Sequence, residues 1–97
     1  MASVQIKKTY GGHTGSEVFM AAKQAIVNAG YKVWKTRELA NLVLGLGEVD
    51  GQEVRINVVG SMIDDSATIS IESDKLDEQA LSEVADKIHS ELAKLLP

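Results

Sequence analysis

Hydrophobic and polar residues alternate along five short segments of this chain, while two longer segments repeat hydrophobic residues at helical spacing. A period of two places successive side chains on opposite faces of a β-strand, and a spacing of three to four marks one face of a helix. The predicted strands are residues 4–10, 31–35, 42–49, 52–59 and 67–72. The first predicted helix is residues 15–29, and the second follows a cap at Asp77. The pattern therefore predicts the element order βαββββα.

Capping residues support both predicted helices. Thr14 and Glu17 match a capping box, in which the hydroxyl accepts from the third helical amide and the carboxylate reaches back to the cap. Asp77 is a suitable cap for the second helix, and Leu76 before it can pack onto Leu81. The expected buried faces are Phe19, Ala22, Ile26 and Ala29 in the first helix, and Leu81, Val84, Ile88, Leu92 and Leu95 in the second.

Two amphipathic helices and one sheet fit a single way of burying their apolar surfaces. Both helices must cover the same apolar sheet face, which gives a two-layer α+β sandwich with a mainly antiparallel sheet. If neighbouring strands alternate in direction, the first strand can pair with the fifth, and the spatial order becomes 2-3-4-5-1. We therefore expect one domain over residues 1–97.

The turn at Asp50-Gly51 is compatible with two registers of the central hairpin. A two-residue loop would pair Leu44 with Asn57, so that leucines lie beside polar side chains. A three-residue loop, Val49 to Gly51, pairs Leu44 with Ile56 and gathers the large apolar residues on one face. We therefore expect the three-residue loop. In that register the helices cover Leu42, Leu44 and Leu46, and the other face carries Val43, Gly45 and Gly47.

The face of the sheet away from the helices is the first candidate for function. If Tyr31 and Val33 face the helices, Trp34 points outward among small and apolar residues. Such a half-apolar sheet face is typical of a self-association or ligand surface. The alternative is that Trp34 covers the sheet edge or enters the core, since tryptophan is highly buried on average. The predicted interface residues are Lys32, Trp34, Val43, Arg55 and Val59.

A glycine-rich loop before the first helix is the second candidate. Its amides and the helix dipole could hold a phosphate or carboxylate group. A lysine after the last glycine, which nucleotide-binding loops carry, is missing. The alternative is a flexible turn followed by a helix cap. The predicted anion-binding residues are Gly11, Gly12, His13, Thr14, Gly15 and Ser16.

Composition removes most catalytic chemistry. The sequence has no cysteine, which excludes disulfides, thiolate catalysis and cysteine-bound metal sites. His13 and Ser16 form the one nearby base and nucleophile, without an orienting acid close in sequence. Glu83, Asp86 and His89 share helical spacing and could form a weak metal-binding surface. Charged helix residues usually form a solvated face instead. We therefore expect a protein without catalytic residues, metal or cofactor.

Charge is distributed unevenly along the chain, whose net charge is −4. Up to Ala40 there are six Lys and Arg against two Asp and Glu, and from Asn41 onward there are four against twelve. One interpretation is that the two parts fold together and neutralise each other. The other is a basic patch on the first two strands that meets an acidic partner. The acidic total and the single tryptophan argue against stacking of single-stranded nucleic acid on Trp34.

Hydropathy gives an expectation about location. No apolar run approaches the ~20 residues that a membrane-spanning helix needs. Residues 1–7 lack the apolar block of a signal peptide. As it stands, the sequence predicts a cytoplasmic protein, and an exported or envelope-associated one if a leader was removed.

Several stretches resemble a family of small bacterial domains of unknown function, often found in lipoprotein-like contexts. They are Val18–Ala22, Ala29–Val33, Asp50–Ile56, Ala67–Ile71 and Leu81–Glu83. The resemblance implies an α+β fold and nothing catalytic. The chain differs from that family in lacking a lipidated cysteine near its start.

Together these observations predict a non-catalytic domain that binds or assembles through the open sheet face or an edge strand. The expected partner is a second copy of the chain, or another protein. The alternative function is binding of a small anion at residues 11–16.

Overall fold

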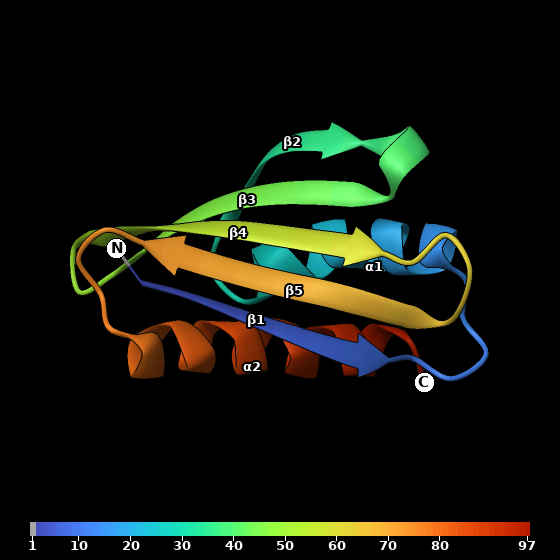
Figure 1. Cartoon of the computed structure of the whole chain (residues 1–97). Helices are drawn as coiled ribbons and strands as arrows, with labels where there is room; N and C mark the ends of the chain where they lie inside the picture. The colour runs from blue at the N-terminus through green and yellow to red at the C-terminus, as the bar shows by residue number, and fades with distance from the viewer. Residues whose placement is uncertain (1) are drawn as a thin grey trace.

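A computed structural model describes residues 2–97 and shows a five-stranded sheet with both helices on one side (Figure 1). Every strand pair is antiparallel, in the spatial order β1-β5-β4-β3-β2. The α+β class, the element order and the strand order are those that the sequence predicts. The elements are β1 (Ala2–Thr9), α1 (Gly15–Asn28), β2 (Lys32–Arg37), the 3-10 helix η1 (Glu38–Ala40), β3 (Leu42–Val49), β4 (Gln52–Gly60), β5 (Ser66–Ser73) and α2 (Glu78–Leu95).

Both helices begin at the predicted caps. The Thr14 hydroxyl accepts from the Glu17 amide at 3.2 Å, and the Glu17 carboxylate accepts from the Thr14 amide at 3.0 Å. The Asp77 carboxylate accepts from the Ala80 amide at 2.9 Å. These bonds satisfy amides that have no partner within the first turn of a helix.

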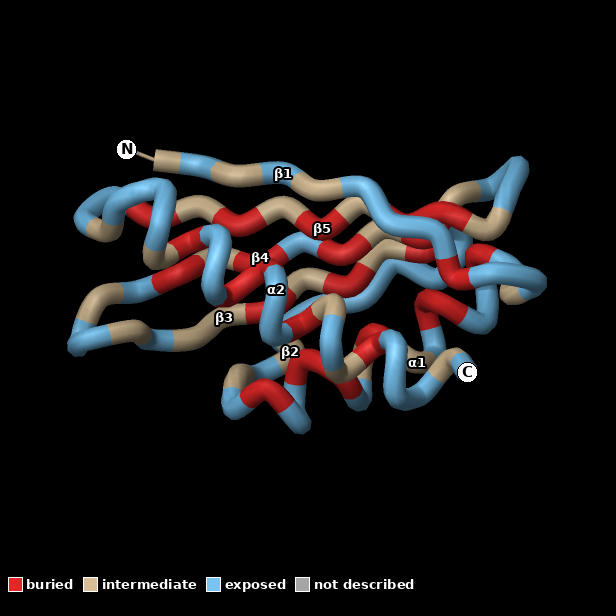
Figure 2. The backbone as a smooth tube through the Cα atoms, turned by 90° about the horizontal axis from the view of Figure 1, so that it is seen from below, coloured by how far each residue is buried: buried red, intermediate tan, exposed pale blue. Residues whose placement is uncertain are grey.

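The core lies between the sheet and the two helices (Figure 2). The expected buried face of α1 is confirmed, and the stripe of α2 is confirmed up to Leu92. Leu95 does not belong to it, since 39% of its surface is exposed. Leu96 packs against the core in its place. The largest fully buried side chains are Ile26, Ile56, Ile69, Ile71, Leu81, Ile88 and Leu92.

The predicted register of the β3–β4 hairpin is wrong. Leu44 pairs with Asn57, so the loop contains only Asp50 and Gly51. Both residues have positive φ angles, 52° and 76°. This is the backbone of a type I′ turn, whose twist matches that of the flanking strands. The leucines at 42, 44 and 46 consequently face away from the helices.

Two glycines explain why this register leaves no hole in the core. Gly45 and Gly47 lie on the helix side of β3, where the prediction placed leucines. A Cβ atom on Gly45 would lie 3.1 Å from Cγ2 of Ile26, and one on Gly47 would overlap the ring of Tyr31. Side chains from α1 and from the residue before β2 therefore fill the space that leucines would occupy.

A β-bulge in β2 turns two successive side chains to the open side. Val33 pairs with Gly45 and Lys35 pairs with Leu44, so Trp34 is the additional residue. Trp34 and Lys35 both lie opposite Leu44, a position that faces away from the helices. Because of the bulge, Thr36 pairs with Val43 and faces the helix side, not the open side as expected from simple alternation.

Candidate functional site: the open face of the sheet

The open face carries a contiguous group of apolar side chains, here named the leucine strip. The register places three leucines of β3 beside Val59 of β4, and the bulge adds Trp34. The leucines are partly exposed, and 56% of the Trp34 surface is exposed. The alternative that Trp34 enters the core is therefore wrong. The leucine strip consists of Trp34, Leu42, Leu44, Leu46 and Val59.

The leucine strip borders a shallow hollow of about 340 Å³. Trp34 forms one side of this hollow, and Arg55 and Asn57 of β4 form the other. Lys35 lies near the outer side of the tryptophan, with its Nζ atom 5.9 Å from the ring centroid. The tryptophan ring therefore lines the hollow and presents an exposed aromatic surface on the open face.

Charges of opposite sign flank the leucine strip. On β2, Lys32, Lys35 and Arg37 lie directly opposite the three leucines and form a basic flank. Four carboxylates lie at the end of the face where the β3–β4 hairpin turns, on β3, on β4 and at the end of β5. Together with Arg55 they form the acidic end of the face. These carboxylates are Glu48, Glu53, Glu72 and Asp74.

Arg55 forms ion pairs with three of these carboxylates. Its Nε atom lies 2.9 Å from Glu72, its Nη2 atom 3.3 Å from Asp74 and its Nη1 atom 3.5 Å from Glu53. Hydrogen bonds to Glu72 and then Asp74 raise the pKa of the guanidinium. Glu48 and Glu53 lie directly opposite each other on neighbouring strands, and like charges in that position repel.

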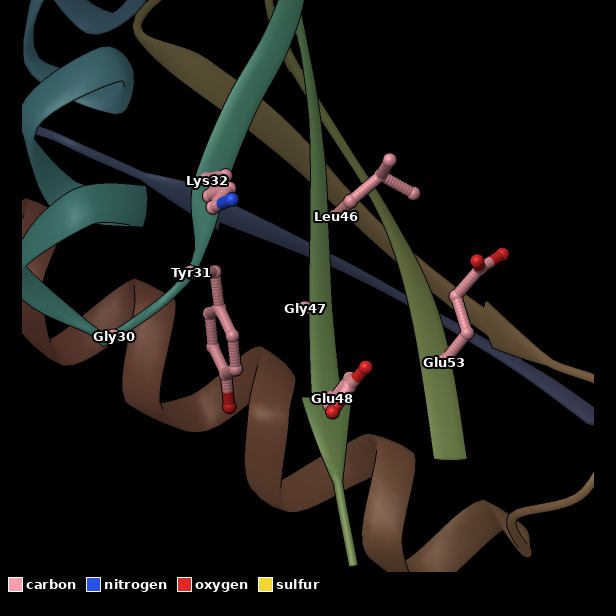
Figure 3. A pocket seen from close by; sticks show the side chains of 7 residues that line it. All are labelled: Gly30, Tyr31, Lys32, Leu46, Gly47, Glu48 and Glu53. Carbon is pink, nitrogen blue, oxygen red and sulfur yellow. The ribbon is translucent and has the colours of Figure 1, made fainter. Parts of the chain in front are cut away.

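A second hollow, of about 440 Å³, lies where β2 begins beside β3 and is lined by residues of both faces of the sheet (Figure 3). Leu46 and Gly47 lie in its middle, between Lys32 on one side and Glu53 on the other. The Tyr31 ring points toward the helix layer (Figure 3), where Nζ of Lys87 lies 5.6 Å from the ring centroid. Lys32 of the basic flank and Glu53 of the acidic end therefore lie on opposite sides of β3.

Four of the five predicted interface residues lie on this face. They are Lys32, Trp34, Arg55 and Val59. The fifth, Val43, is wrong, because it faces the helices and is fully buried. The prediction missed the three leucines. The Asp-Gly pair was the signal that could have found them, because it strongly favours a two-residue type I′ turn.

The predicted anion-binding loop has protein groups on several of its amides. The Gly12 amide donates to the Asp65 carboxylate at 3.4 Å, and the Thr14 amide donates to Glu17 at 3.0 Å. The His13 amide donates to the carbonyl of Tyr10. Carboxylates therefore lie where an added anion would bind, and they repel it. The arrangement offers no support for anion binding at residues 11–16.

The imidazole of His13 joins this loop to the end of the chain. Its Nε2 atom lies 3.0 Å from the Pro97 oxygen, and its Nδ1 atom lies 3.1 Å from the Glu17 carboxylate. These two acceptors raise the pKa of His13, since a protonated ring donates to both. In the facing turn, hydrogen bonds from Ser66 lower the pKa of Asp64 to about 2.

His89 has the opposite electrostatic setting. Its Nδ1 atom lies 2.8 Å from the hydroxyl of Tyr10, a residue that is only 4% exposed. Burial raises the pKa of Tyr10 to about 12. Burial first, and then the nearby charge of Lys8, lowers the pKa of His89. This pair joins α2 to the end of β1 and is a structural contact.

On acidification, His13 is expected to become charged at a higher pH than His89. Both start from an ordinary pKa of 6.5, raised at His13 by its two acceptors and lowered at His89 by burial. His89 therefore adds stability that is present above pH 6.5 and is lost as the pH falls through its own pKa. His13 adds stability that is present below pH 6.5 and is lost as the pH rises through its own pKa. NMR titration of the two imidazole signals measures this order, and a His89 signal that titrates first would contradict it.

No known protein family matches the chain, and no curated protein matches it either. The resemblance to lipoprotein-like domains therefore stays a prediction. Neither helix within residues 2–97 has the length and apolarity needed to cross a bilayer. The same residues hold no group of three or more His, Cys, Asp or Glu side chains that could bind a metal ion.

Proposed function

We propose that this chain is a non-catalytic assembly domain that forms a homodimer through the open face of its sheet. The single observation that carries the proposal is the direction of the three β3 leucines. In a two-layer sandwich the helices cover only one sheet face, so apolar residues on the other face remain in contact with water. Contiguous exposed apolar side chains with a polar surround are typical of protein interfaces.

The composition of the leucine strip supports this proposal. Trp34 and Arg55 lie beside aliphatic side chains. Tryptophan and arginine are among the residues that contribute most to the binding free energy of protein interfaces. The strip lies on strands that are paired on both sides, or on a bulged strand fixed to them. Little conformational freedom is therefore lost when a partner binds.

The edges of the sheet are less suited to pairing with another chain. The bulge at Trp34 interrupts β2, and Lys32, Lys35 and Arg37 charge it. The other edge strand, β1, carries Lys7 and Lys8. Bulges and lysines on edge strands hinder the addition of a further strand. We therefore favour the open face over an edge strand as the contact surface.

Light scattering at high micromolar concentration tests the proposal. The expected mass is twice the 10.4 kDa of one chain, falling toward one chain on dilution. NMR signals that change on dilution are expected at Trp34, Leu44 and Val59. Signals of Gly11 to Ser16 should stay constant and act as an internal control. A mass of one chain at every concentration would reject the homodimer.

A further inference from the structure

We infer that His13 is a pH-sensitive latch, which holds residues 96 and 97 against the start of α1 and releases them when its ring loses a proton. Both ring nitrogens of His13 have an oxygen acceptor. Nε2 lies 3.0 Å from the backbone oxygen of Pro97, and Nδ1 lies 3.1 Å from the carboxylate of Glu17. The inference does not rest on the proposed homodimer, because none of these residues belongs to the open face of the sheet.

The number of protons on the ring decides whether both contacts can exist. A neutral imidazole donates one hydrogen bond, whereas an imidazolium donates two. Both partners of His13 are oxygen acceptors, and the pKa of Glu17 is lowered, first by the Thr14 amide and then by His13 itself. Only the protonated ring can therefore donate to both partners. When the proton is lost, one ring nitrogen presents a lone pair to an oxygen.

The contact to Pro97 is the one expected to break. Glu17 is fixed by the capping box, in which its other carboxylate oxygen accepts from the Thr14 amide at 3.0 Å. Pro97 lies beyond the end of α2 at Leu95 and, as a proline, has no amide to bond to the helix. The neutral ring therefore keeps its proton on Nδ1, facing Glu17, and Nε2 no longer donates to Pro97.

Leu96 is the residue whose order depends on the latch. It packs against the core, and its amide donates to the Leu92 carbonyl at 3.0 Å. Its backbone angles, φ −124° and ψ 63°, are not helical. Chain segments beyond the last turn of a helix are poorly ordered unless other contacts hold them. His13 supplies such a contact, since the end of the described chain lies beside the loop between β1 and α1 (Figure 1).

Acidic groups lie on two sides of His13 and favour its charged form. Glu17 lies on α1, and Asp64, in the turn after β4, lines the same hollow of about 300 Å³ as His13. Asp65, in the same turn, accepts from the Gly12 amide at 3.4 Å. Negative charges near an imidazole favour the imidazolium. The closed latch is therefore the form present in acid.

The end of β1 and α2 lie on the other sides of the loop. The Tyr10 carbonyl accepts from the His13 amide, and burial raises the pKa of Tyr10 to about 12, so its hydroxyl stays neutral. The hydroxyl contacts His89, on which the charge of Lys8 acts. In the last turn of α2, Lys94 is paired with Glu91 at 3.2 Å.

The direction of the pH dependence follows from the contacts of His13. Hydrogen bonds to Pro97 first, and then to Glu17, raise the pKa of His13 above its ordinary value of 6.5. The latch is therefore closed below pH 6.5 and opens as the pH rises through the raised pKa. The pKa of His89 is lowered from the same value, so the two histidines titrate in separate pH ranges.

NMR titration of the Leu96 amide tests the latch. Its signal is expected to shift with the same midpoint as the His13 imidazole, and its heteronuclear NOE is expected to fall as the pH rises. His13→Gln replaces the ring by a side chain that does not titrate, so this pH dependence should be lost. A Leu96 signal that stays constant while His13 titrates would overturn the inference.

Glu17→Gln shifts the expected midpoint without removing the helix cap, because glutamine also completes a capping box. The variant lacks the carboxylate that helps to raise the pKa of His13, so the midpoints of His13 and Leu96 should move together to lower pH. Glu83→Gln, the same change at an exposed position nearer the start of α2, should leave both midpoints unchanged. A Leu96 response that persists in His13→Gln, or that follows the His89 midpoint, would overturn the inference.

Discussion

Val43→Asp is expected to abolish folding, whereas Leu44→Asp, one residue further along the same strand, is expected to leave the fold intact. Val43 is fully buried against the helices and pairs with Val58. A carboxylate there would be buried without a partner, at a cost of several kcal/mol, in a domain whose total stability is about 5–15 kcal/mol. Leu44 lies on the open face, where the aspartate reaches water and costs about 1 kcal/mol through its lower strand propensity.

Urea unfolding followed by circular dichroism measures this difference. The two variants carry the same substitution on neighbouring residues, so each acts as the control for the other. A folded Val43→Asp and an unfolded Leu44→Asp would show that the hairpin has the three-residue loop after all.

Gly15→Ala is expected to destabilise the protein by about 1–3 kcal/mol, although this substitution within a helix normally stabilises by about 0.5–1 kcal/mol. Gly15 is the first residue of α1 and is buried against the segment that follows β4. A Cβ atom there would overlap the carbonyl oxygen of Ser61 and lie 2.7 Å from Nδ2 of Asn41. Backbone atoms cannot rotate away, so the helix would have to move.

Gly11→Ala is the matched control for that substitution. Apart from its neighbours in the chain, a Cβ atom at Gly11 would meet no atom of the described residues within 4 Å. Its stability should therefore change by no more than about 0.5 kcal/mol, as at other open surface positions. Equal effects of the two alanine variants would contradict the close packing of α1 on the end of β4. Gly60 is a second sign of this close packing, since a Cβ atom there would overlap the carbonyl of Gly15.

The elements of the fold were predictable because local chemistry determines them. Capping boxes, glycine breaks and periods of two or three to four are properties of short segments, and all seven predicted elements are present. The strand order was predictable too, since alternating directions leave the first strand a single free edge to occupy.

The face of β3 was not predictable from the number of apolar residues on each side. That count assumes that each strand buries its own largest side chains. Here Ile26 and Tyr31 come from other segments and fill the space above Gly45 and Gly47. Such packing depends on contacts between distant parts of the chain. The turn preference of Asp-Gly was local and would have given the observed register.

The bulge at Trp34 had no clear signal either, because bulges depend on the partner strand as well as on the bulged residues. Its effect on the candidate site was small, since Trp34 faces outward both with and without it. The predicted surface was therefore right in position, and richer in apolar side chains than expected.

Isotope-filtered NOE spectra of a mixture of labelled and unlabelled chains test the central claim most directly. Contacts between chains are expected at the methyl groups of the three β3 leucines and Val59. Methyl groups of Met20 and Val27, which are exposed on α1, should show none. Contacts between chains that involve only α1, or that are absent at millimolar concentration, would contradict assembly through the open face of the sheet.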